Sequence, residues 1–263
     1  MERLDFFSHR QISTNAYLVT ENYGISARFS VGVVVGLEQI AVIDAGLGLS
    51  GSLRKYIEGF AGTEKPFLCY CTSGKAEHIG AAAQFDTAYV SSLDAALPAH
   101  NWAGALPDAI VRYGTAIRPE SGAPAFQELT PGFIAIGRQH ISPRPMPGNT
   151  PGSFVLINGE EKLCFLGDAV GPEVTVLPYL DRAGMNGYAE QLTMLTEERG
   201  GELRFYCGRS AEPLSAGYLL RVAAACRAIA EGKTSGDLPA AEAGRRMHIA
   251  ENAAVVYDAA KCE

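Results

Sequence analysis

The chain has 263 residues, 47% hydrophobic and 19% charged, a composition that allows a sizeable packed core and argues against disorder. Lysine and arginine number 22 against 29 acidic residues, a net charge of −7, and no basic run is present, which argues against a nucleic-acid partner. Segment 1–8 lacks the apolar core of a signal peptide, and no stretch approaches the roughly 20 apolar residues of a membrane helix. We therefore expect a cytoplasmic protein, not a membrane protein, with reduced thiols.

The first part of the chain alternates predicted strands and helices. Short apolar, β-branched runs predict strands at 15–19, 31–35, 40–43, 67–71 and 88–90. Apolar residues at helical spacing after Ser50 or Ser52 predict a capped helix that contains Leu53 and Ile57. Two further helices are expected at 77–85 and 91–97.

The second part of the chain repeats this alternation. The segment 105–113 is a candidate helix, and 119–124 is expected to be a loop. Strands are predicted at 133–136, 154–157, 162–166, 203–207 and 253–257. The step Asn158-Gly159 indicates a hairpin between two of them. Two late helices have apolar stripes, formed by Tyr188, Leu192 and Leu195 and by Leu219, Val222, Cys226 and Ile229. The pattern predicts two α/β halves packed as one domain over 1–263.

Five short motifs at the element junctions carry a family resemblance. They are I-A-V-I-D-A-G-L-G at 40–48, C-T-S-G-K-A-E-H-I-G at 71–80, P-G-N-T-P-G-S at 147–153, L-C-F-L-G-D-A-V at 163–170 and Y-C-G-R at 206–209. In order and spacing they resemble the metallo-β-lactamase superfamily, with the compact glyoxalase II-like hydrolases as the nearest group. The resemblance implies an α/β fold of four layers, the αββα sandwich, in a single domain.

The resemblance also assigns the family's metal-ligand positions to residues of this chain. Five histidines and two aspartates hold one or two metal ions, usually zinc, in such proteins. Those positions fall on Ser73, Lys75, Glu77, His78, Asn149, Asp168 and Arg209. Only His78 and Asp168 keep the family's residue, and Glu77 keeps a carboxylate. The first metal position thus loses all three of its histidines.

The charges of these residues also bear on whether a metal ion can bind. The carboxylates of Glu77 and Asp168 are matched by the cations of Lys75 and Arg209, and a divalent ion placed beside those cations would be repelled. We therefore predict no bound metal cofactor. The alternative is one zinc or other divalent ion held by Glu77, His78 and Asp168.

Three functional hypotheses follow from this set. In the first, a metal-free cleft binds or converts a small, possibly anionic molecule, with Lys75, Glu77, His78, Asp168 and Arg209 as the catalytic candidates. Lining residues that would contact the ligand are Ser73, Asn149 and Cys207. The second hypothesis is a mononuclear metal-dependent hydrolase, and the third is a non-catalytic relative with a structural or partner-binding role. The sequence names neither a substrate nor an oligomeric state.

Overall fold

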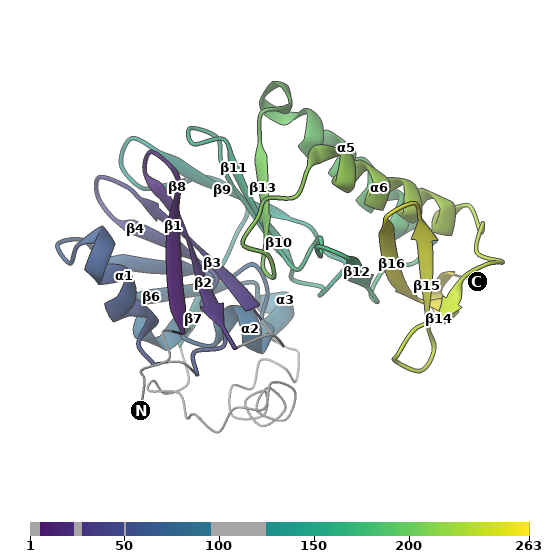
Figure 1. Cartoon of the computed structure of the whole chain (residues 1–263), viewed down its shortest axis with the longest axis horizontal. Helices are drawn as coiled ribbons and strands as arrows, with labels where there is room; N and C mark the ends of the chain where they lie inside the picture. Colours follow the sequence, from purple (N-terminus) through teal and green to yellow (C-terminus); the bar gives the residue numbers. More distant parts are fainter. Residues whose placement is uncertain (1–5, 24–27, 50, 96–124, 263) are drawn as a thin grey trace.

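A computed structural model describes residues 6–23, 28–49, 51–95 and 125–262 (Figure 1). Its N-terminal part forms a seven-stranded sheet in which the strands follow one another in sequence order. Pairing is antiparallel from β1 to β4 and parallel from β4 to β7. The strands are β1 (Phe7–Ser13), β2 (Ala16–Asn22), β3 (Arg28–Val35), β4 (Ile40–Ile43), β5 (Phe67–Tyr70), β6 (Thr87–Val90) and β7 (Phe126–Glu128).

A second sheet of five strands lies against the first. Its order is β13 (Arg204–Cys207), β11 (Leu163–Gly167), β10 (Phe154–Asn158), β9 (His140–Pro145) and β8 (Ile134–Ala135). Side chains from both sheets, among them Leu18, Ile43, Leu156 and Phe165, form one buried apolar cluster between them. This cluster is the centre of a sandwich, because each sheet contributes its inward-facing residues to a shared core.

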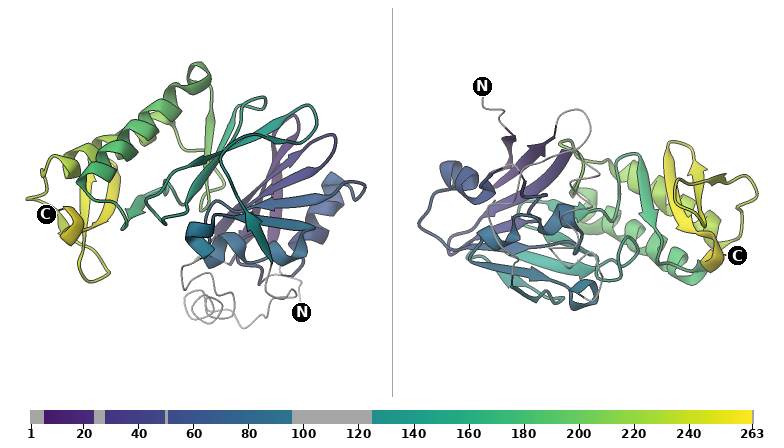
Figure 2. Two further views of the ribbon diagram at one scale, coloured as in Figure 1. Left: turned by 180° about the vertical axis from the view of Figure 1, so that it is seen from behind. Right: turned by 90° about the horizontal axis from the view of Figure 1, so that it is seen from below.

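Helices cover the outer faces of both sheets. Helix α1 (Leu53–Ala61), α2 (Ala76–Ile79) and the 3₁₀-helix η1 (Ala82–Gln84) pack against the first sheet through one buried cluster. The long helices α5 (Arg182–Glu197) and α6 (Ala216–Ala230) pack against the second through another. Figure 2 shows the resulting order of helix, sheet, sheet and helix. The predicted αββα sandwich is confirmed.

A third sheet has four strands, three of which come from the C-terminal part of the chain. It consists of β12 (Val174–Leu177), β16 (Ala253–Asp258), β15 (Arg245–Ala250) and β14 (Leu238–Pro239). Val255 and Tyr257 of β16 belong to the same buried cluster as α5 and α6. The sequence predicted β16 but not its three partners. Further short helices are α3 (Ser92–Ala95), η3 (Glu198–Gly201) and α7 (Ala259–Cys262). No helix in the described part of the chain is long and apolar enough to span a membrane.

The helix expected at 77–85 is wrong in its length, because α2 ends at Ile79. The amides of Gly80 and Ala81 donate to the carbonyls of Gly46 and Ala45, at 2.8 and 3.2 Å, instead of continuing the helix. A Cβ at Gly80 would lie only 2.1 Å from the carbonyl of Leu47. The chain therefore leaves the helix where it must lie against the loop that follows β4.

The hairpin at Asn158-Gly159 is confirmed, and its turn extends beyond these two residues. Asn158 is still in β10 and pairs with Leu163 of β11, which leaves four residues in the turn. The side chain of Asn158 accepts a hydrogen bond from the Glu161 amide at 2.8 Å. The left-handed residue is Lys162, with φ of 55°. The helix expected at 91–97 is described as α3 (Ser92–Ala95), and the expected helix 105–113 and loop 119–124 lie outside the described residues.

Candidate functional site

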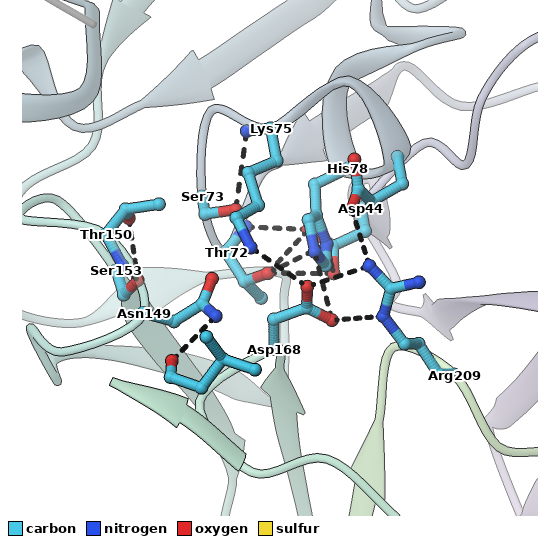
Figure 3. A network of polar contacts seen from close by, with 12 residues as sticks. Asp44, Thr72, Ser73, Lys75, His78, Asn149, Thr150, Ser153, Asp168 and Arg209 are labelled. Atoms are coloured by element: carbon cyan, nitrogen blue, oxygen red, sulfur yellow. Dashed lines mark hydrogen bonds and ion pairs between the residues drawn. The ribbon is translucent and has the colours of Figure 1, made fainter. Parts of the chain in front are cut away.

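The site lies where several strands end. Asp44 follows β4, residues 72–75 follow β5, Asp168 follows β11 and Arg209 follows β13. Strands β4 and β5 are parallel, as are β11 and β13, so their carboxyl ends meet at common edges of the two sheets. The sandwich brings these edges together, and the side chains converge there (Figure 3).

Asp168 is the centre of the polar network. One of its oxygens lies 3.4 Å from Lys75 Nζ, and Arg209 donates to both oxygens from Nε and Nη2, each at 3.2 Å. His78 Nε2 lies 3.5 Å from Oδ1, an ion-pair distance that is longer than a hydrogen bond. Burial alone would raise the pKa of Asp168, but His78, Arg209 and Lys75 outweigh it and hold the pKa well below its ordinary value. Asp168 is therefore ionised and surrounded by cations.

Arg209 joins this carboxylate to a second one. Its Nη2 lies 2.5 Å from Oε1 of Glu77, which stands in the first turn of α2 and has a side chain only 7% exposed. The guanidinium also lies over the ring of Phe29, 5.6 Å from the centroid, a favourable cation–π arrangement. The planar group of Arg209 thus links α2 to the loop after β11.

His78 is fixed from its other side by Asp44. The Nδ1 atom lies 2.9 Å from Asp44 Oδ2, and Asp44 also accepts from the amide and hydroxyl of Thr72, at 2.7 and 2.9 Å. Asp44 has φ of 63°, in the left-handed region that aspartate tolerates better than most residues. Burial alone would lower the pKa of His78, but Asp44 and Asp168 outweigh it and hold the pKa well above its ordinary value.

Charges in this network are arranged by depth. The carboxylates of Asp44, Glu77 and Asp168 are only 4%, 7% and 9% exposed. The side chains of Lys75 and Arg209 are 30% and 34% exposed. An incoming molecule therefore meets the two cations, while the acidic groups lie beneath them and are already paired.

Asn149 lies on the loop between β9 and β10, across from Lys75 (Figure 3). Its Nδ2 donates to the carbonyl of Val176 in β12 at 2.9 Å. Its Oδ1 is buried and has no hydrogen-bond partner among the described residues. The residue is only 4% exposed, so the structure brings an unsatisfied acceptor to the edge of the network.

Asp94 is a site residue that the sequence did not reveal. It is fully buried in α3 and accepts from the amide of Gly74 at 2.8 Å, from the amide of Gly152 at 2.7 Å and from the hydroxyl of Thr150 at 2.7 Å. These donors belong to the two loops that carry Ser73, Lys75 and Asn149. No local pattern marks Asp94, because its donors come from segments 20 and 56 to 58 positions away in sequence.

The other two expected ligand contacts are buried side chains. Ser73 is 2% exposed, and its hydroxyl accepts from the Lys75 amide at a long 3.5 Å. Cys207 is also 2% exposed and belongs to the apolar cluster beneath α5 and α6. Burial raises the pKa of its thiol to about 11, so the thiol is protonated at neutral pH and a poor nucleophile. Of the predicted set, the structure joins Lys75, Glu77, His78, Asp168 and Arg209 in one network.

Comparison with known proteins identifies relatives of this chain. No family model matches it. Acyl-coenzyme A thioesterase MBLAC2 from Gallus gallus is 30% identical over 203 residues, an alignment that covers 68% of this chain and 72% of that protein. The protein of the same name from Bos taurus is 27% identical over 223 residues, covering 75% and 79%.

Solved structures agree with this result. A metallo-beta-lactamase from Pontibacter korlensis superposes with a TM-score of 0.60 at 17% identity, covering 83% of this chain and 99% of that one. The αββα sandwich is therefore a fold shared with that protein. The chain belongs to the metallo-β-lactamase superfamily.

The residues present do not fit the zinc of that superfamily. Zinc prefers histidine and cysteine ligands with a few carboxylates, in open tetrahedral geometry. Here Glu77 and Asp168 already bind Arg209, and Asp168 also lies 3.4 Å from Lys75 Nζ. Within the described ranges no three histidine, cysteine or acidic groups are placed to hold a metal ion. A zinc ion would have to displace Lys75 and Arg209 from the carboxylates they neutralise.

Proposed function

We propose that this chain is a metal-free member of the superfamily whose cleft binds a small anionic molecule through Lys75 and Arg209. The observation that carries the proposal is the ion-pair network itself. Lys75 and Arg209 stand at positions that the family resemblance assigns to metal ligands, and they are the solvent-exposed part of the site. In this proposal the side chains of Lys75 and Arg209 supply the positive charge that a metal ion would supply.

Electrostatics favours an anion over a cation at this place. An anionic ligand can approach Lys75 and Arg209 from the solvent side while both keep their buried carboxylate partners. A divalent cation would have to separate ion pairs whose acidic members are more than nine-tenths buried, which leaves uncompensated charge. Arginine also suits this role, because its planar fork matches carboxylate and phosphate groups.

The relatives suggest which anion to test first. The curated relatives are named acyl-coenzyme A thioesterases, and coenzyme A carries several phosphate groups. We therefore take coenzyme A and its short acyl thioesters as the first ligands. Binding is the core of the proposal, and thioester hydrolysis is measured beside it. If turnover occurs, His78 is the candidate for proton transfer, since it lies in the network between Asp44 and Asp168.

The test combines metal analysis with titration calorimetry. Protein purified in the presence of zinc is expected to hold far less than one ion per chain, and coenzyme A is expected to bind more weakly as salt rises. Lys75→Gln removes one exposed cation and should weaken binding by roughly tenfold. The matched control is Lys55→Gln, an exposed lysine on α1, away from the network. One tightly held ion per chain with chelator-sensitive activity, or equal binding by the Lys75 variant and the wild type, would overturn the proposal.

A further inference from the structure

Two buried polar atoms of this site lack a hydrogen bond to any described residue: His78 Nε2, which lies 3.5 Å from Asp168 within the ion-pair network, and Asn149 Oδ1, which as an amide oxygen takes part in no ion pair. Asn149 Oδ1 is buried in a residue only 4% exposed and has no partner among the described residues. Buried acceptors are nearly always hydrogen-bonded, and each exception needs a physical reason. The network of ion pairs does not supply one, because it ends at Lys75 and Asp168.

The orientation of the Asn149 amide is fixed by its surroundings. Its nitrogen donates to the Val176 carbonyl at 2.9 Å. A flipped amide would place its oxygen against that carbonyl, which also only accepts. The oxygen is therefore turned away from the Val176 carbonyl and toward the side chains of Lys75 and Asp168 (Figure 3). An unpaired acceptor and a cation thus lie on the same side of the network.

From this geometry we infer that the ligand is an anion that also carries an uncharged hydrogen-bond donor, such as a hydroxy acid. Its charged group meets Lys75 and Arg209, and its hydroxyl donates to Asn149 Oδ1. This inference rests on the proposed function, since it adds a specificity contact to the same anion site. A site built to receive a donor discriminates strongly against an analogue that lacks it, because the buried acceptor is then left unpaired.

Matched acids provide the probes. Lactate and propionate differ by one hydroxyl, as do 3-hydroxybutyrate and butyrate, which place the hydroxyl one carbon further away. Ligand titrations followed by NMR should show at least one hydroxy acid binding roughly fivefold to tenfold more tightly than its partner. The ratio within a pair is the readout, because both members contact the same cations and damage to the fold affects them alike.

Two variants of Asn149 test whether its side-chain oxygen is the hydrogen-bond acceptor for the ligand. Asn149→Leu keeps the approximate size and removes the oxygen, so the preferred pair should bind equally well. Asn149→Asp keeps an acceptor at the Oδ1 position, but it adds negative charge and replaces the donor to the Val176 carbonyl by an oxygen, so both acids should bind less tightly while the preference for the hydroxy acid remains. Loss of the preference in the leucine variant alone supports the inference.

The measurements distinguish a failure of this inference from a failure of the proposed function. If the wild type binds the members of both pairs equally while Lys75→Gln weakens all four acids, the anion site stands and the role of Asn149 is refuted. If none of the acids nor coenzyme A binds, or if Lys75→Gln changes nothing, the proposed function fails and the inference fails with it. If the hydroxy acid is preferred equally by wild type and Asn149→Leu, another residue makes the contact and the inference is wrong.

Discussion

Replacement of Asp94 by alanine is the sharpest test of how the site is held together. The carboxyl group is fully buried and accepts three hydrogen bonds, from the amides of Gly74 and Gly152 and the hydroxyl of Thr150. Asp94→Ala leaves the amides of Gly74 and Gly152 buried without an acceptor, and leaves the Thr150 hydroxyl with Ser153 Oγ, 2.7 Å away, as its hydrogen-bond partner. At about 1–3 kcal/mol for each unsatisfied group, with partial relaxation and water entry, we expect a loss of about 3–5 kcal/mol in the free energy of unfolding.

Urea denaturation measures this loss directly, and hydrogen exchange locates it. The amides of Gly74 and Gly152 should exchange much faster in the variant, because their acceptor is gone. Asp94→Asn keeps one acceptor oxygen and should cost about 1–2 kcal/mol. Leu93→Ala, at a 62% exposed position on the same helix, should change stability by less than about 0.5 kcal/mol. A loss below about 1 kcal/mol in Asp94→Ala, with both amides still protected, would show that Asp94 does not join the two loops.

Four further predictions concern the ion-pair network and the backbone that positions it. Lys75→His restores one family ligand and should raise zinc affinity, measured by competition with a chromogenic chelator; unchanged affinity contradicts the placement of Lys75. Arg209→Met removes the ion pair of the buried Glu77 carboxylate and one of the cations around Asp168, and should cost about 3 kcal/mol in urea unfolding, whereas a neutral effect means that the pairs are solvated. Gly80→Ala should cost about 2 kcal/mol or more, because its Cβ would overlap the Leu47 carbonyl, and wild-type stability would refute that close approach. The pKa of His78 is raised in the folded state, so protonated His78 stabilises the fold fully below about pH 6.5, and this contribution is lost as pH rises through the folded-state pKa. The free energy of unfolding of the wild type should therefore fall relative to that of His78→Gln over that pH range. If the two free energies change in parallel with pH, this coupling is excluded.

Local sequence was enough for most of the fold. The buried strands β3, β4, β10 and β11 and the capped helix α1 were predicted, because apolar periodicity and capping act between near neighbours in the chain. The third sheet was largely missed. Its strands β14 and β15 are short or only half buried, and β12 is a four-residue strand whose partner, β16, lies about 80 residues later. Such strands have little local signal and depend on their partners.

The sequence by itself determined which chemical groups stand at the family's ligand positions, and that their charges balance. Tertiary structure decided how they pair: Arg209 bridges Glu77 and Asp168, while His78 is held by Asp44. It also decided that carboxylates are buried and cations exposed, and that Asn149 keeps an unpaired oxygen. The physical reason is distance along the chain. Residue type is a local property, but burial and pairing arise only when the sandwich brings together loops that the sequence separates.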